Sequence, residues 1–231
     1  MKIIIKDNYE EMSYAALGLF IESLKGSKVL GFATGNTPKL LYGMISNECI
    51  AGNISFKGKY SFNLDEYYPI SRTDGASYHH YMDANLFKNI DIDSSRINFP
   101  DAMLSPDETV RHYSDAYREF GPVDLQILGI GHNGHIGFNE PGSPRNSRIR
   151  VVQLSNDTIM RNNTKVRTAL TMGVKEILES RKIIVIASGK EKSEAVKNAV
   201  NGKITEKVPA SFLQEHKDAV LVLDGGAASM L

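Results

Sequence analysis

Residues 123–142 read VDLQILGIGHNGHIGFNEPG, an apolar run followed by a loop rich in glycine, histidine and asparagine. Short apolar runs of this kind recur along the whole chain, and amphipathic segments with helical spacing separate them. Seven of these runs are predicted to be buried strands: KIII at residues 2–5, 28–33, 59–64, 123–128, 167–172, 182–187 and 219–223. Such alternation predicts an α/β fold built on a parallel, doubly wound sheet.

Helix boundaries are marked between these runs. Gly26 is expected to close a first helix, and Thr37-Pro38 to open a second. A capping box at residues 105–108 predicts the start of a third helix, which Gly121-Pro122 should end. The sequence shows no internal repeat or long polar linker, so we expect one domain over residues 1–231.

The composition excludes several classes of partner. Lys and Arg number 27 and Asp and Glu also number 27, so there is no basic excess to attract nucleic acid or an anionic membrane. The apolar run near the N-terminus is too short for a secretion signal or a membrane span, and we therefore expect a cytoplasmic protein. Cys49 is the only cysteine, which excludes an intrachain disulfide.

Polar, glycine-rich segments follow four of the predicted strands. In doubly wound sheets, ligands bind in the crevice outside the carboxyl ends of the strands. The residues after each run are therefore expected to meet at one site. These segments are ATGNTP (33–38), DEYY (65–68), the loop at 129–142 and SGKEK (188–192).

Two of these segments are predicted to bind phosphate. Residues Thr34, Gly35, Asn36 and Thr37 link a strand to a helix start, where free N–H groups and the helix dipole favour an anion. Lys192 is the expected cation, because a lysine in a first helical turn is poorly placed unless an anion offsets it. The alternatives are an ordinary N-cap turn and a solvated lysine.

Asp65-Glu66 is expected to supply a general base. Partial burial at the end of a strand would raise the pKa of a carboxylate toward that of a useful base. Because neighbouring strand residues point to opposite sides, only one of the pair should face the crevice, and Asp65 is nearer the strand end. Taken alone, such a pair is also typical of a solvated turn or a helix N-terminus.

The loop at 129–142 admits three other interpretations. Residues 129–134 match the dinucleotide pattern G-x-G-x-x-G, but no helix opens at the third glycine, so a nicotinamide or flavin cofactor is not expected. His132, His135 and Glu140 are possible metal ligands, yet their spacing matches no helical ligand pair. The third is a glycine-rich loop with buried structural histidines, and the density of polar groups disfavours it.

Taken together, the four segments resemble one known family. LDEY, GxxNGHIGFNEP, ATGNTP and GKEKSEAV are similar to segments of the glucosamine-6-phosphate deaminases, and PASFLQEH resembles the closing segment of that family. The resemblance covers nearly the whole chain. It implies a Rossmann-like three-layer α/β fold with a mostly parallel sheet, no metal and no organic cofactor. It also implies conversion of an amino-sugar 6-phosphate, here glucosamine 6-phosphate, to the ketose phosphate and ammonia.

The same resemblance implies a role for each matching residue. Asp65 would move a proton between C2 and C1 of the open-chain sugar. His135 would assist opening of the pyranose ring, with Glu140 orienting it or sharing its charge. The cradle at 34–37 and Lys192 would hold the 6-phosphate, so that Asp65 meets C2.

Three departures from the family pattern limit this transfer. Some members carry Asp where this chain has Asn133, and an amide supports a histidine by hydrogen bonding without relaying a proton. The arginine of the family's lid has no counterpart in register, which leaves Arg161, Lys165 and Arg167 as open alternatives. The chain also ends soon after Asp224, so we do not expect the allosteric control of longer members.

Other functions remain as alternatives. Galactosamine 6-phosphate differs only at C4, which the sequence does not resolve. A 6-phosphogluconolactonase would not need Asp65, and a non-catalytic sugar-phosphate sensor would have little use for Asp65, His135 and Glu140 together. We expect a small-molecule sugar phosphate as ligand and a monomer or small homo-oligomer.

Overall fold

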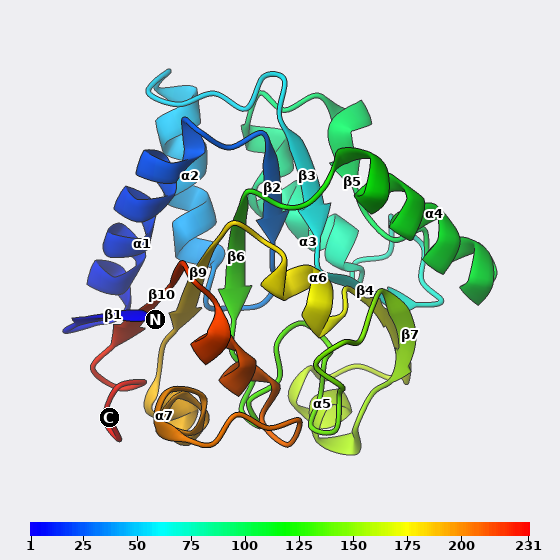
Figure 1. The fold of residues 1–231 in the computed structure, drawn as a ribbon. Coiled ribbons are helices and arrows are strands. Elements are labelled where there is room, and N and C mark those ends of the chain that lie inside the picture. Colours follow the sequence, from blue (N-terminus) through cyan, green and yellow to red (C-terminus); the bar gives the residue numbers. More distant parts are fainter.

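Seven strands form one sheet in which every neighbouring pair is parallel. The computed structural model describes all residues from 1 to 231 (Figure 1). The order across the sheet is β1 (Lys2–Lys6), β10 (Ala219–Asp224), β9 (Lys182–Ala187), β6 (Leu125–Gly129), β2 (Val29–Phe32), β3 (Tyr60–Asn63) and β5 (Ile97–Asn98). The predicted α/β class and the parallel sheet are confirmed.

The direction of winding reverses between β2 and β6. From β2 the chain proceeds outward to β3 and β5, and then returns to the other side of β2 to build β6, β9 and β10. Loops that leave β2 and β6 must therefore part in opposite directions, which opens a crevice above their carboxyl ends. The loops 33–38 and 129–142 begin at this reversal.

Helices cover both faces of the sheet, so the three-layer arrangement is also confirmed (Figure 1). Helices α1 (Tyr9–Leu24), α2 (Lys39–Ile50) and α3 (Tyr78–Asn85) pack on one face. Helices α4 (Pro106–Phe120), α6 (Val174–Leu178) and α7 (Ser193–Asn201) pack on the other, with the 3₁₀ segments Lys190–Lys192 and Pro209–Glu215. Alternate residues of one strand supply the two cores: Ile184 faces α1 and α2, whereas Val185 faces α4 and α7.

The third predicted helix begins and ends as expected. Ser105 caps α4 and exchanges hydrogen bonds with Glu108, which completes the capping box. Gly121 follows the last residue of this helix. Helix α2 differs, because no side chain caps it at Pro38 and the N–H groups just before it are left free.

One predicted strand lies in a different sheet. Residues 167–172 were expected in the parallel sheet, but β8 (Thr168–Thr171) pairs antiparallel with β4 (Asp65–Tyr68) and β7 (Arg150–Gln153). An apolar run specifies burial without specifying its partner, so its pattern does not distinguish the two sheets. Residues 65–68, expected as a segment that follows the strand at 59–64, are themselves a strand of this second sheet.

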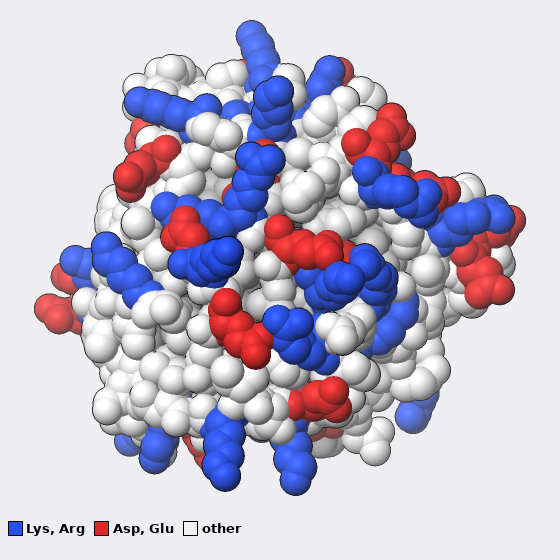
Figure 2. Space-filling model, viewed as in Figure 1, with Lys and Arg blue, Asp and Glu red and all other residues white.

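The surface agrees with the balanced composition. Figure 2 shows basic and acidic side chains intermixed over the viewed face, with no continuous basic area. No helix has both the length and the apolar character needed to cross a bilayer.

Candidate active site

A cavity of about 460 Å³ lies at the carboxyl ends of the central strands. Residues from all four predicted segments line it: 33–39, then 64, 65 and 67, then 129–132, 135, 137 and 138, and finally 191–192. Side chains from α3 and from the segment of α5 (Asn156–Arg161) complete its wall. Of the predicted site residues, Thr34, Gly35, Asn36, Thr37, Asp65, His135 and Lys192 line the cavity, whereas Asn133 and Glu140 lie behind its wall.

Asp65 is a buried carboxylate on the cavity wall. It is the first residue of β4, and only 5% of its surface is exposed. Burial, with a smaller contribution from the charge of Glu66, raises the pKa of Asp65 to about 8. A hydrogen bond from the Phe138 backbone opposes this increase without cancelling it. Such a carboxylate can take up and release a proton near neutral pH.

Glu66 points away from the cavity, as period-two alternation predicts. Its carboxylate accepts hydrogen bonds from the backbone N–H groups of Tyr67, Tyr78 and His79 at 2.8–2.9 Å. Two of these donors are the first residues of α3. Glu66 therefore anchors α3 to β4, and the two neighbouring carboxylates have different surroundings and different roles.

His135 is held in one orientation by Asn133. The Oδ1 atom of Asn133 lies 2.7 Å from Nδ1 of His135 and 3.2 Å from the backbone nitrogen of the same residue. Because the backbone N–H can only donate, the amide must present its oxygen. The ring therefore carries its proton on Nδ1 and leaves Nε2 as an acceptor.

Burial, together with the charge of nearby Lys192, lowers the pKa of His135 to about 4. The imidazole is therefore neutral at physiological pH. The ring packs directly on Gly131, where an added Cβ would lie 2.1–2.3 Å from the ring atoms. Only glycine at position 131 leaves room for the His135 ring in this position.

Glu140 does not hydrogen bond to His135. Both of its carboxylate oxygens accept from the backbone N–H of Ser155 at 3.2 Å, and Ser155 is the N-cap of α5. Its negative charge nevertheless favours the protonated form of His135 and so raises the pKa of that ring. Glu140 thus connects the histidine loop to the α5 segment.

The loop at 34–37 offers four unused donors. None of the backbone N–H groups of Thr34, Gly35, Asn36 and Thr37 donates to an acceptor within the protein. Gly35 adopts a φ of +119°, a conformation that favours glycine and turns the loop toward the cavity. The Tyr81 hydroxyl donates to the Gly35 carbonyl at 2.5 Å, so α3 holds the loop in place. This arrangement suits an anion such as phosphate.

Three cationic or titratable side chains line the same cavity as these donors. Lys192 and Arg161 line the cavity together with His132. The pKa of His132 is lowered by burial and by both cations, which places the three groups within electrostatic range of one another. Of the three basic residues left open by the sequence, Arg161 lines the cavity, while Lys165 and Arg167 do not.

Aromatic residues of the wall were missed by the sequence argument. Tyr67, Tyr78 and Phe138 form a cluster with ring centroids 4.7–5.8 Å apart, and all three line the cavity. Asn162, which follows α5, also lines it. Period-two spacing from Asp65 would have identified Tyr67, but Tyr78 and Asn162 arrive through tertiary contacts.

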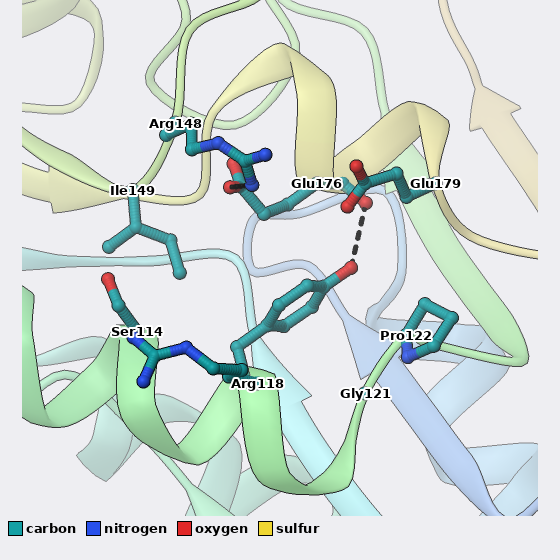
Figure 3. A pocket seen from close by; sticks show the side chains of 9 residues that line it. Ser114, Arg118, Gly121, Pro122, Arg148, Ile149, Glu176 and Glu179 are labelled. Atoms are coloured by element: carbon teal, nitrogen blue, oxygen red, sulfur yellow. Dashed lines mark hydrogen bonds and ion pairs between the residues drawn. The ribbon is translucent and has the colours of Figure 1, made fainter.

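A second, larger hollow of about 670 Å³ lies between α4, residues 148–149 and α6 (Figure 3). Its polar groups pair with one another: Arg148 lies 3.2 Å from the Glu176 carboxylate, and the Tyr117 hydroxyl donates to the Glu176 carbonyl. None of the predicted site residues lines it. Size is therefore a poor guide here, and we assign the chemistry to the smaller cavity.

The structure also bears on the metal interpretation of the histidine loop. It brings together no group of three or more His, Cys, Asp or Glu side chains that could hold a metal ion. The Nδ1 atom of His135 hydrogen bonds to the Asn133 side chain, and the Glu140 carboxylate accepts a hydrogen bond from the Ser155 backbone.

Comparisons with known proteins agree with this geometry. Residues 19–222 match the family model described as glucosamine-6-phosphate isomerases/6-phosphogluconolactonase. Glucosamine-6-phosphate deaminase from Clostridium botulinum (strain Langeland) is 44% identical, with 100% of this chain and 99% of the relative covered. The enzyme of the same name from Halothermothrix orenii is 42% identical, with both chains fully covered.

Solved structures of related proteins superpose closely on this chain. A structure described as a monomeric glucosamine-6-phosphate deaminase superposes with a TM-score of 0.96 at 38% identity, over 100% of both chains. The 6-phosphogluconolactonase from Leishmania guyanensis reaches a TM-score of 0.83 at 21% identity, covering 98% of this chain and 97% of that one. At that identity the likeness extends to the fold alone.

The reversal of winding, the free N–H groups of residues 34–37 and the buried Asp65 and His135 are the features expected of an enzyme that acts on sugar phosphates. Within that class the sequence relatives and the closely superposing structure are deaminases. This chain belongs to the glucosamine-6-phosphate deaminase family.

Proposed function

We infer that this chain converts glucosamine 6-phosphate and water to fructose 6-phosphate and ammonia. The single observation that carries this conclusion is that Asp65 and His135 line the same cavity as the free N–H groups of residues 34–37. A phosphate bound to that cradle holds the sugar chain in reach of both groups. The deaminase relatives, similar over their full length, support the same reaction.

In the first step His135 opens the ring. Its neutral Nε2 takes the proton of the anomeric hydroxyl while Nδ1 stays bonded to Asn133, and the proton passes to the ring oxygen as the C1–O5 bond breaks. The imidazolium that forms in passing is stabilised by the negative charge of Glu140. Asn133 and Glu140 therefore act on the reaction through His135.

In the second step Asp65 transfers a proton along the sugar. The carboxylate removes the proton from C2 of the open-chain aldehyde, the electron pair shifts onto the C1 carbonyl, and that oxygen takes a proton from the C2 ammonium to give an enolamine. Returning the proton to C1 leaves a ketose imine at C2. Water adds to this imine and ammonia leaves, which balances the overall reaction. The raised pKa of Asp65 suits both halves of this transfer.

The phosphate is bound by the backbone of residues 34–37, by Lys192 and by Arg161 of the α5 segment. Arg161 pairs with Asp157 at 2.9 Å, at the exposed rim of the cavity. Substrate phosphate competes with Asp157 for this guanidinium, and the pairing draws α5 over the sugar.

Residues 1–231 act as one catalytic unit, and the protein works as a monomer, as the similar solved deaminase is described. Its ligand is a small sugar phosphate, with neither nucleic acid nor membrane as partner. We place the reaction in the cytosol, because the phosphate charge prevents such a sugar from crossing a bilayer. Asp65 and His135 supply the acid–base chemistry without a resident metal or organic cofactor.

The test is to incubate the purified protein separately with glucosamine 6-phosphate, galactosamine 6-phosphate and 6-phosphogluconolactone. Ammonia, ketose phosphate and acid release are measured in each case. Ammonia and fructose 6-phosphate in equal amounts from the first sugar are expected. Ammonia from neither amino sugar would refute the proposed function, and a preference for the C4 epimer would redirect it to galactosamine.

A further inference from the structure

The Tyr67 hydroxyl carries a proton that nothing in the protein accepts. Tyr67 lies two residues after Asp65 on β4, so both side chains leave the strand on the same side, and both line the cavity. Only 4% of the surface of Tyr67 is exposed. A buried tyrosine hydroxyl usually finds a partner, so the direction of each of its hydrogen bonds matters.

Both acceptor positions of this oxygen are filled. The Asn162 side-chain amide donates to it at 3.0 Å, and the Tyr78 hydroxyl donates to it at 3.2 Å. A hydroxyl accepts two hydrogen bonds and donates one. No hydrogen bond within the protein uses the Tyr67 proton, so that proton is available to a molecule in the cavity.

The phenol is also held rigidly. Its ring packs against Tyr78 at 4.7 Å and Phe138 at 5.6 Å between centroids. Tyr78 is the first residue of α3, and Tyr81 of the same helix donates its hydroxyl to the Gly35 carbonyl, so α3 connects this network to the phosphate loop. Burial raises the pKa of Tyr67 above that of an ordinary phenol, which keeps its proton in place at any working pH.

We propose that Tyr67 is a further substrate-positioning residue, which donates its hydroxyl proton to a sugar hydroxyl oxygen at C3 or C4. This inference rests on the proposed function. The phosphate on C6 lies at residues 34–37 and the reacting C2 lies at Asp65, while His135 serves the oxygen of C5. The hydroxyls at C3 and C4 are the acceptors that remain between these fixed points.

The network gives Tyr67 a second consequence. Asn162 follows α5 and Tyr78 begins α3, so the two hydrogen bonds to Tyr67 join the α5 segment to α3, and both segments line the cavity. A sugar hydroxyl that accepts from Tyr67 polarises the phenol and strengthens both incoming hydrogen bonds. Recognition of the sugar and ordering of the α5 segment are thereby coupled.

The experiment compares wild type with Tyr67→Phe, which keeps the ring and removes only the hydroxyl. Steady-state kinetics are measured on glucosamine 6-phosphate and on its 3-deoxy and 4-deoxy analogues. We expect Tyr67→Phe to raise KM for the natural sugar about tenfold with kcat little changed. For the analogue that lacks the recognised hydroxyl, wild type and variant should have the same KM, which also identifies the carbon.

Two controls separate recognition from a structural role. Tyr14→Phe, on the exposed outer face of α1, should match wild type on every sugar. Tyr78→Phe removes a donor to Tyr67 but keeps the Tyr67 proton, so it should preserve the difference between natural and deoxy sugars. Thermal unfolding of each variant shows that it is folded.

The inference would be overturned if Tyr67→Phe raised KM by the same factor on all three sugars. It would also be overturned if KM rose on none of them. Either result, with wild type active on glucosamine 6-phosphate, leaves the proposed function intact. A wild type without ammonia release would instead refute the proposed function itself.

Discussion

Asn133 presents an uncharged amide oxygen 2.7 Å from Nδ1 of His135, at a position where some family members carry a carboxylate. The amide fixes the tautomer as a carboxylate would, but it adds no negative charge to favour the imidazolium. With burial and Lys192 acting in the same direction, the pKa of His135 falls to about 4. The imidazole of His135, the proposed ring-opening base, is therefore neutral down to acidic pH.

Asn133→Asp should raise the pKa of His135, by about 1–3 pH units, because an adjacent carboxylate favours the charged ring. His135 then becomes protonated at a higher pH, so the second, steeper fall of kcat/KM at acidic pH, below the fall set by Asp65, should begin at a higher pH. An NMR titration of the His135 ring, beside the pH–rate profile, measures both changes. An unaltered titration midpoint would contradict the assigned hydrogen bond.

Asp65→Asn should abolish isomerisation and leave binding of the substrate nearly unchanged, because the phosphate contacts lie in other loops. In the wild type, the base form of Asp65 accumulates as pH rises through about 8, so kcat/KM should increase up to that pH. Isothermal titration with substrate measures the binding. A large loss of affinity in the variant would show that Asp65 has been misassigned.

The same variant makes a prediction about stability. The folded-state pKa of Asp65 lies above its ordinary value of 3.8, so stability is greatest below that value and is lost as pH rises through about 8. Asp65→Asn removes the buried charge. It should therefore raise the free energy of unfolding at pH 9, on the order of a few kcal/mol, and hardly change it at pH 4. The melting temperature at each pH measures this change. Equal effects at both pH values would contradict this.

Glu66→Ala should act on stability. The substitution leaves one N–H group on β4 and two at the start of α3 without their acceptor, at a cost of about 2–4 kcal/mol of unfolding free energy. Urea unfolding measures this loss, and Asp65→Asn at pH 4 is the matched comparison on the same strand. If Glu66→Ala proved as stable as wild type and lost the C2 proton transfer, the roles of the two carboxylates would have to be exchanged.

Gly131→Ala should impair catalysis without disturbing the fold. An added Cβ would meet the His135 ring at 2.1–2.3 Å, and because the flanking sheet is rigid the ring must move. We expect kcat to fall by about 10²-fold, the usual effect of displacing a catalytic group by about 1 Å. The matched control is Gly18→Ala in α1, where no atom lies within 4 Å of the added Cβ and activity should stay at the wild-type level. Full activity in Gly131→Ala would argue against His135.

Arg161→Ala should raise KM by about 10–100-fold, since a charge-assisted phosphate contact contributes about 1.5–3 kcal/mol. Lys165→Ala and Arg167→Ala are the matched controls, because neither side chain lines the cavity. Competition by inorganic phosphate should weaken in Arg161→Ala and stay the same in both controls. A larger effect of either control would move the phosphate contact to that residue.

Much of the fold and part of the candidate site were predictable from the sequence. The apolar runs at 123–128 and 182–187 identify β6 and β9, and the box at Ser105 identifies the start of α4, because strand burial and helix capping depend on adjacent residues. The placement of ligand loops at strand ends follows from a parallel sheet alone. Asp65, His135 and the loop at 34–37 were found in this way.

The sequence by itself thus determined the α/β class, the loops that meet at the crevice and the side of β4 on which Asp65 points. Only the tertiary structure decided that β8 joins an antiparallel sheet, that Glu140 binds Ser155 and that Tyr67 receives Asn162 and Tyr78. The physical reason is range. Periodicity and capping act within a few residues. Strand pairing and buried hydrogen bonds join distant residues, such as Asn162 and Tyr67, which are 95 positions apart, and no local pattern in one sequence reports such a pairing.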